Sequence, residues 1–476
     1  MPQTMQNSSV FLASKVTPSQ RQLEWQKLEF YAFCHFGTNT FTGKEWGDGN
    51  ASPSLFNPKH LDAEQWVKEI KNAGMRALIL TCKHHDGFCL WPSKFTDYSV
   101  KNSPFRNGQG DVVKEVSDAC KKHGIKFGVY LSPWDRHEKS YGTGAEYNSY
   151  FVNQLTELAE NYGEIFCFWF DGACGEGKNG KKQVYDWDKY FALIREKQPN
   201  AVISICGTDV RWCGNEAGKY RSAEWSVVPS YIGDQKYTAE NSQQTDDENF
   251  AKKVNGTAED LGSRSAIEGV RDFIWYPCET DVSIRPGWFY HKSQDFKVKS
   301  VKKLMDIYYG TVGGNSAFLL NIPPDKNGLI SKHDVRVLRK FGKSLRQEFS
   351  ENLALNARVS ASSEIGENKA LNVLSANGFW QCSEEDASPE ITLEFENSII
   401  IDKIVLCENI ETGQQIESFE IFAEKESGFE KIGSGETVGA KRICRFPPIK
   451  TRKIKVKITS YRRIATIKQI ELYCKN

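Results

Sequence analysis

The sequence lacks any apolar run of about 18 residues, the length that a membrane-spanning helix needs. Its longest apolar stretches, such as Ile165–Phe170, are only as long as a β-strand. It also lacks an excess of either charge, because 62 Lys and Arg residues balance 61 Asp and Glu residues for a net charge of +1. A nucleic-acid-binding protein needs a basic surface. We therefore expect no membrane insertion and no nucleic-acid partner.

Paired cysteine motifs are missing as well. The 13 cysteines are an odd number, and none of them forms a CxxC pair with metal-ligand spacing. Several, including Cys34, Cys82 and Cys167, lie in apolar runs, where cysteine behaves as a small buried residue. The first residues, Met1–Asn7, have neither the charged nor the apolar part of a secretory signal. A trimmed form of a periplasmic or secreted enzyme would look the same, so the sequence assigns no compartment.

The first 350 residues alternate between strand-like and helix-like patterns. The predicted strands are mostly continuous apolar runs, as in parallel strands that are buried on both faces. They begin near Tyr31, Arg76, Lys126, Ile165, Ala201, Ala223, Phe273 and Ala317. The predicted helices are Asp62–Ala73, Asp111–His123, Glu146–Tyr162, Tyr185–Lys197, Val298–Tyr309 and Val335–Phe349. This alternation predicts an α/β fold, a (β/α)₈-like TIM barrel over residues 1–350. The doubly wound alternative lacks a GxGxxG motif after its first strand.

After residue 350 the helical patterns stop and six short strand-like segments follow. Such a series predicts a C-terminal β-sandwich over residues 351–476. Its opening Leu355–Ser363 and its closing Ile467–Tyr473 resemble a discoidin-type jelly roll. This part could bind glycan or simply pack against the barrel. Within the barrel, the polar stretch Ile232–Gly269 is predicted to be a long loop.

Barrel enzymes gather their functional residues where the strands end. The polar and aromatic residues after the predicted strands and in the following loops are His35, Glu45, Trp46, His84, His85, Tyr130, Trp169, Asp171, Glu216, Glu279 and Trp288. Indoles offer flat apolar faces to a sugar ring, and imidazoles and carboxylates can hydrogen-bond its hydroxyl groups. The pattern therefore favours a carbohydrate-binding cleft.

Each of these residues also has a purely structural interpretation. His35 could be a core histidine, and Asp171 could cap a helix or turn. The pair His84-His85 is harder to explain structurally, since two imidazoles are costly to bury without a polar partner. A metal-dependent barrel hydrolase is a competing hypothesis. Barrel metal sites commonly use an HxH pair, but the first strand carries only His35, so we predict no metal and no other cofactor.

Several motifs together resemble the α-L-fucosidases of glycoside hydrolase family 29. They are His35-Phe36-Gly37, Glu45-Trp46, Lys83-His84-His85-Asp86-Gly87-Phe88, Trp91-Pro92-Ser93, Trp169-Phe170-Asp171-Gly172 and Glu279-Thr280-Asp281. The resemblance covers roughly residues 20–350. It implies a retaining, metal-independent enzyme with a catalytic barrel and a C-terminal β-sandwich, acting on a fucosylated oligosaccharide or glycoconjugate.

The resemblance also implies roles for individual residues. Asp171 matches the nucleophile, and Trp288 resembles a residue that stacks on the fucose side. Matches to fucose-binding positions are His35, Glu45, Trp46, His84, His85, Tyr130 and Trp169. The acid/base varies within the family. We favour Glu216, because Asp209–Gly218 resembles the subfamily that cleaves α-1,3/1,4-linked fucose from branched, Lewis-type glycans, and Glu279 is the alternative.

Three other functions stay open at this point. They are a broad-specificity α-L-fucosidase that includes α-1,2-linked or aryl fucosides, a metal-dependent hydrolase, and a carbohydrate-binding protein without activity. The presence of both Asp171 and a candidate acid argues against the last of these. No sequence feature predicts an oligomeric state.

Overall fold

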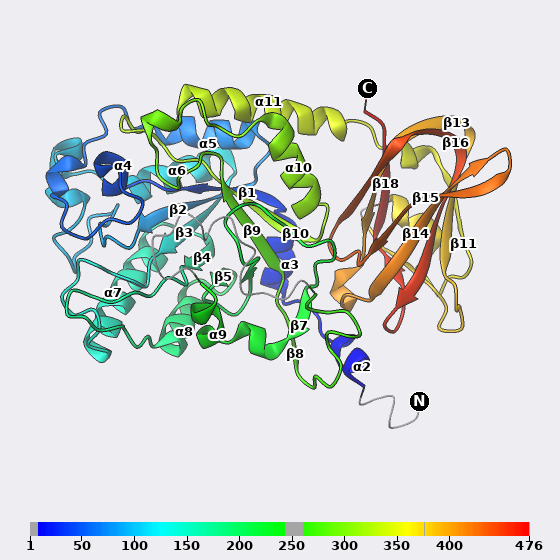
Figure 1. Cartoon of the computed structure of the whole chain (residues 1–476), viewed down its shortest axis with the longest axis horizontal. Helices are drawn as coiled ribbons and strands as arrows, with labels where there is room; N and C mark the ends of the chain where they lie inside the picture. The colour runs from blue at the N-terminus through cyan, green and yellow to red at the C-terminus, as the bar shows by residue number, and fades with distance from the viewer. Residues whose placement is uncertain (1–7, 243–259, 376, 476) are drawn as a thin grey trace.

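The computed structural model describes residues 8–242, 260–375 and 377–475 (Figure 1). Met1–Asn7 and the central part of the predicted loop Ile232–Gly269 lie outside these residues. Within the described ranges, no helix has the length and apolar character to cross a membrane.

Eight parallel strands form the N-terminal barrel. They are β1 (Phe30–Cys34), β2 (Ala77–Lys83), β3 (Lys126–Leu131), β4 (Ile165–Phe170), β5 (Val202–Ile205), β6 (Arg211–Trp212), β9 (Cys278–Ser283) and β10 (Ser316–Asn321). Their order is β5-β4-β3-β2-β1-β10-β9-β6. A parallel bridge joins Ser204 of the edge strand β5 to Val210, the residue directly before the other edge strand β6, so the barrel is nearly closed. The predicted barrel class is confirmed.

Helices surround the barrel, as the apolar periodicity predicts (Figure 1). The longer ones are α5 (Ala63–Asn72), α6 (Val112–His123), α7 (Ala145–Asn161), α8 (Trp187–Lys197), α10 (Val301–Thr311) and α11 (Lys332–Glu348). Shorter helices are α2 (Ser9–Ala13), α3 (Gln20–Gln26), α4 (Thr38–Thr42) and α9 (Gln235–Glu240). Local chemistry sets the ends: Asp62 and Asp111 cap α5 and α6 by accepting main-chain N–H groups, and Gly124 ends α6 at a φ of 67°.

Alternation along each strand separates two apolar cores. In β1, Phe30, Ala32 and Cys34 face the helices, whereas Tyr31 and Phe33 join the core inside the barrel. Successive side chains on a strand point to opposite faces, so a residue two positions beyond an inward one also points inward. Because of this alternation, polar residues that follow the inward-facing positions at the strand ends point toward the mouth of the barrel.

The predicted positions of strands six and seven are wrong. The segments near Ala223 and Phe273 contain β7 (Val227–Pro229) and β8 (Phe273–Trp275), which pair with each other in a separate antiparallel sheet. The barrel instead uses β6 and β9. Strand β6 has only two residues, and β9 places polar residues inward, so neither has the apolar pattern of a buried strand.

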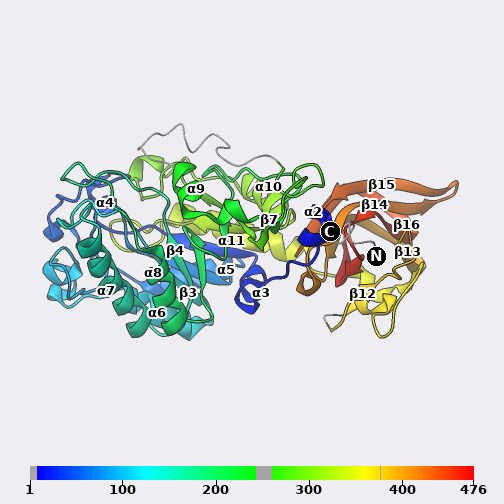
Figure 2. The ribbon, with the colours of Figure 1, turned by 90° about the horizontal axis from the view of Figure 1, so that it is seen from below.

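The C-terminal part is an antiparallel β-sandwich that lies beside the barrel (Figure 2). Its strands are β11 (Arg358–Ala361), β12 (Trp380–Gln381), β13 (Glu390–Cys407), β14 (Ile416–Lys425), β15 (Gly428–Glu436), β16 (Arg442–Tyr461), β17 (Thr466–Ile467) and β18 (Gln469–Tyr473). Strand β13 joins the strand-like segments Ile391–Phe395 and Ile399–Leu406, and β16 joins Arg442–Phe446 and Lys453–Ile458. The pairing of the two strands shifts register along their length. The predicted β-sandwich is confirmed.

Candidate active site

A small open cavity lies at the carboxyl ends of the barrel strands. Its lining residues are Phe33, His35, Trp46, His84, His85, Tyr130, Trp169, Asp171, Ala173, Glu216, Asp281 and Trp288. The structure thus brings together every site residue predicted from the sequence except Glu45 and Glu279. Among the described residues, no three His, Cys, Asp or Glu side chains converge as a metal site would require.

Asp171 follows β4 and remains partly accessible, with 26% of its side chain exposed. The Tyr130 hydroxyl donates to Oδ2 at 3.0 Å, and the main-chain N–H of Ala173 donates to Oδ1 at 2.8 Å. His85 Nε2 lies 3.8 Å from Oδ2. Two donors therefore orient a carboxylate that a ligand in the cavity can still reach.

His35 is held in one orientation at the cavity wall. Asn321 donates its amide hydrogens to Ser283 Oγ and to the Trp288 carbonyl, so its Oδ1 faces His35 as an acceptor. The His35 Nδ1 atom lies 2.9 Å from that oxygen and must donate to it. Burial lowers the pKa of His35 to about 3, so the ring is neutral near pH 7. Its Nε2 atom is then an acceptor for a ligand hydroxyl.

His85 is, like His35, a neutral imidazole whose Nδ1 atom donates a hydrogen bond. Ser132 donates its hydroxyl hydrogen to the Trp134 carbonyl at 2.6 Å, so its oxygen accepts from His85 Nδ1 at 2.7 Å. Burial lowers the pKa of His85 to about 4, although the charge of Asp171 opposes the shift. Burial also lowers the pKa of His84 well below its usual value. The cavity therefore offers neutral imidazoles, which suit hydroxyl groups better than anions.

Aromatic rings form the remaining walls. Tyr130 and Trp169 stack with their centroids 5.3 Å apart, and Trp46 meets the His85 ring edge-on at 5.1 Å. The Trp288 ring lies 5.0 Å from His35. Flat apolar faces beside hydroxyl acceptors are the surfaces that a sugar ring requires.

Glu216 enters the cavity from the segment after β6. Its Oε2 atom accepts the indole N–H of Trp288 at 3.0 Å. Asn215 forms a side-chain turn at this point, because its Oδ1 accepts the main-chain N–H groups of Ala217 and Lys219, both at 3.0 Å. The turn and the indole together hold the Glu216 carboxylate at the cavity wall.

Glu45 and Glu279 lie outside the cavity lining but contact residues that form it. Glu45 accepts the main-chain N–H of Trp288 at 2.7 Å and pairs with His291 at 2.6 Å. Glu279 was expected after strand seven, but it lies within β9, fully buried, where the indole N–H of Trp169 donates to it at 2.7 Å. Burial raises the pKa of Glu279 to about 7.

Asp281 lines the cavity, but the sequence analysis placed it only in the Glu279-Thr280-Asp281 motif and gave it no role in the site. It is buried in β9, two residues beyond Glu279, and accepts the indole N–H of Trp212 at 2.9 Å. Burial and the neighbouring charge of Glu216 raise the pKa of Asp281 well above its usual value. The two-residue spacing from Glu279 was the available signal, because it places both carboxyls on the inner face of one strand.

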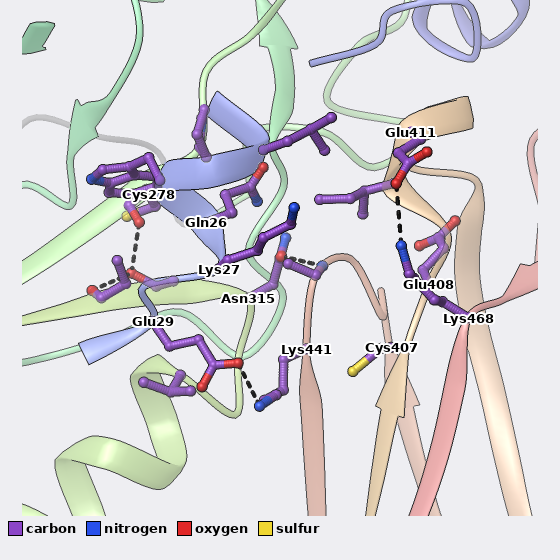
Figure 3. Close-up of a pocket in the computed structure, with 18 of the residues that line it drawn as sticks. Gln26, Lys27, Glu29, Cys278, Asn315, Cys407, Glu408, Glu411, Lys441 and Lys468 are labelled. Atoms are coloured by element: carbon purple, nitrogen blue, oxygen red, sulfur yellow. Dashed lines mark hydrogen bonds and ion pairs between the residues drawn. The ribbon is translucent and has the colours of Figure 1, made fainter. Parts of the chain in front are cut away.

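A second cavity lies between the opposite end of the barrel and the β-sandwich (Figure 3). Cys278, the first residue of β9, lines it, so it is remote from the strand ends that carry Asp171. Four of its charged groups form two ion pairs: Glu29 with Lys441 at 2.5 Å, and Lys468 with Glu411 at 3.2 Å. No histidine is among the described residues that line this cavity, so it lacks the imidazoles found at the first.

Comparisons with known proteins give consistent results. Residues 6–348 match the alpha-L-fucosidase family, and residues 358–471 match the F5/8 type C domain. Alpha-L-fucosidase 1 of Arabidopsis thaliana is 43% identical over 467 residues, covering 96% of this chain and 87% of the plant protein. A GH29 fucosidase of Ruminococcus gnavus, solved in complex with fucose, is 32% identical with a TM-score of 0.83, and the match covers 97% of this chain and 95% of that one.

Proposed function

This chain belongs to the alpha-L-fucosidase family, and from that premise we propose that it is a retaining exo-α-L-fucosidase for α-1,3/1,4-linked fucose on branched, Lewis-type glycans. The observation that carries the proposal is Asp171, a partly exposed carboxylate that Tyr130 and Ala173 orient at the exit of β4. Retaining glycosidases require such a nucleophile and a second carboxyl that acts as acid and then as base. Glu216 is our candidate for the second role.

The reaction takes two displacements. Asp171 attacks the anomeric carbon of fucose while Glu216 donates a proton to the glycosidic oxygen, and the carbon–oxygen bond to the rest of the glycan breaks. Glu216, now ionised, takes a proton from a water molecule that attacks the same carbon. The bond to Asp171 breaks, and fucose leaves with its original anomeric configuration.

We propose distinct roles for the other residues. His35, His84 and His85 accept hydrogen bonds from fucose hydroxyls, because burial keeps their rings neutral. Tyr130 orients the nucleophile, and Trp46, Trp169 and Trp288 supply the apolar walls. Glu45 acts from behind the cavity through the Trp288 main chain, and Glu279 acts through Trp169.

The linkage preference and the domain division are further parts of the proposal. The segment Asp209–Gly218 would contribute a subsite for the sugar that carries the branch. We place the boundary between the catalytic barrel and the β-sandwich at residues 350 and 351, directly after α11.

Two measurements test the proposal. The Asp171→Asn variant should lose several orders of magnitude in kcat on an aryl fucoside while keeping its folded circular-dichroism spectrum. NMR of the first product should show the α-anomer of fucose. Near wild-type activity of the variant, or β-fucose as the first product, would refute the mechanism. Equal kcat/KM values on a Lewis trisaccharide and an α-1,2-fucosyl oligosaccharide would refute the linkage preference alone.

A further inference from the structure

The segment that carries Glu216 is anchored by the β-sandwich. Gln414, in the loop between β13 and β14, is fully buried at the seam between the two parts. Its Oε1 atom accepts the main-chain N–H of Ser226 at 2.7 Å, and its Nε2 atom donates to the Glu224 carbonyl at 3.4 Å. Both polar ends of one side chain thus bond across the seam to the same short stretch of main chain.

Neighbouring side chains reinforce this anchor. Arg442, the first residue of β16, donates to the Ser222 carbonyl at 2.9 Å. Asn315, which precedes β10, donates to the Glu224 carbonyl at 2.8 Å and accepts the main-chain N–H of Ala440 at 2.8 Å. Loops of the sandwich and of the barrel therefore hold the main chain of residues 222–226 together.

A buried ionic cluster connects this stretch to the Glu216 turn. The Glu224 carboxylate pairs with Arg211 and with Arg221, the latter at 2.9 Å. Arg221 also donates to the Cys213 carbonyl at 3.2 Å. Because a buried charge is costly to leave unpaired, these contacts keep residues 211–213 and residues 221–224 from moving apart.

The ionic cluster ends next to the Asn215 turn that presents Glu216. From Gln414, a hydrogen bond to Glu224, the Glu224–Arg221 ion pair and the hydrogen bond from Arg221 to the Cys213 carbonyl lead toward this turn, and two residues of main chain complete the connection. A general acid must lie within hydrogen-bond reach of the oxygen that it protonates, and a displacement of about 1 Å can cost about 10²-fold in rate.

We propose that Gln414 is a positioning residue for catalysis: the β-sandwich uses it to hold residues 209–226 so that Glu216 faces the leaving group. This inference rests on the proposed acid/base role of Glu216. It gives the β-sandwich a part in the chemistry that does not depend on glycan binding by the sandwich itself.

The chain provides a matched control at the next position. Gln415 is also a buried glutamine of the same loop, but its Nε2 atom donates to the Ser14 carbonyl, in the segment after α2, at 2.8 Å. Gln414→Ala and Gln415→Ala each remove one side-chain amide from the seam. Only Gln414→Ala removes contacts to the segment that carries Glu216.

The test compares kcat/KM on a Lewis trisaccharide and on 4-nitrophenyl α-L-fucoside. For each substrate, kcat/KM reports the first displacement. In that step the leaving group of the trisaccharide needs a proton from Glu216, whereas the nitrophenolate leaving group hardly needs one. We expect Gln414→Ala to lower the trisaccharide value roughly 10–100-fold and the aryl value less than about 3-fold. Gln415→Ala should change both values equally. If Gln414→Ala does not fold, Arg442→Ala, which removes the contact to Ser222 from a half-buried position, should give a smaller selective loss.

Glu216→Ala is the reference for interpreting these variants. If it shows the selective loss but Gln414→Ala behaves like Gln415→Ala, the positioning role is refuted and the proposed function survives. If Gln414→Ala does not fold and Arg442→Ala shows no selective loss, the positioning role is likewise refuted. If Glu216→Ala itself loses both substrates equally, the acid/base assignment fails, and the positioning role fails with it.

Discussion

The indole nitrogen of Trp288 donates a hydrogen bond to Oε2 of Glu216 at 3.0 Å, although the two residues are 72 positions apart. This contact joins the loop after β9 to the segment after β6 at the wall of the cavity. Glu279, the other candidate acid, bonds to Trp169 behind the cavity.

The first concerns which carboxyl is the acid/base. Glu216→Ala should retain turnover of an activated aryl fucoside when azide is added, because azide attacks the fucosyl-enzyme without needing a base. The product should be the α-fucosyl azide, identified by NMR, while hydrolysis of a Lewis trisaccharide stays roughly 10²–10⁴-fold below wild type. Glu279→Ala should show no azide rescue. Rescue at position 279 and not at 216 would reverse the assignment.

The second concerns the indole that holds Glu216. Trp288→Phe keeps an aromatic ring but removes the donor that holds Glu216 in place, and a displacement of a catalytic group by about 1 Å can cost about 10²-fold in rate. We expect kcat/KM for the trisaccharide to fall roughly 10–100-fold. Trp91→Phe is the control, since Trp91 donates to the Glu157 carboxylate at 2.8 Å outside the cavity lining. Equal losses in the two variants would show that the Trp288 contact has only a structural role.

The third concerns the hydroxyl that orients Asp171. Tyr130→Phe should lower kcat about 10-fold or more, with a smaller change in KM, because the nucleophile loses one of its two donors. Tyr309→Phe removes a similar hydroxyl, which donates to the Glu348 carboxylate at 3.0 Å next to the β-sandwich. That control should leave kcat unchanged. A Tyr130→Phe variant with the kcat of wild type would contradict the orienting role.

The fourth concerns the buried Glu279 and pH. Because burial raises its pKa to about 7, its folded form holds a proton that the unfolded chain releases near pH 4.5. The wild-type protein therefore loses stability from this group as the pH rises from about 4.5 to about 7. The unfolding free energy of Glu279→Gln minus that of wild type should rise by roughly 1–3 kcal/mol from pH 5 to pH 8, as measured by urea titration.

Glu348→Gln is the control for this measurement. Although burial opposes the shift, Lys475 and Lys403 hold the pKa of Glu348 below its usual value, so the carboxyl is ionised throughout the window. The difference between Glu348→Gln and wild type should therefore be the same at pH 5 and pH 8. A flat difference for Glu279→Gln as well would mean that Glu279 is ionised in the folded protein.

The sequence by itself determined the barrel class, the β-sandwich and most helix limits, because these depend on local patterns. Asp62 and Asp111 cap their helices through bonds that reach only three residues along the chain. Continuous apolar runs such as Ile165–Phe170 identify strands that are buried on both faces. Strand ends then locate residues such as Asp171, because parallel strands bring their carboxyl ends to one side.

Only the tertiary structure decided which strands complete the barrel and which carboxyls face the cavity. Strand β9 carries Glu279 and Asp281 on its inner face, so no apolar pattern marks it as a buried strand. Their environments differ because Glu279 lies one layer deeper than Asp281, against Trp169. Contacts between Gln414 and residues 224–226 join segments almost 190 positions apart. Such contacts depend on the packing of the whole chain, which no local pattern contains.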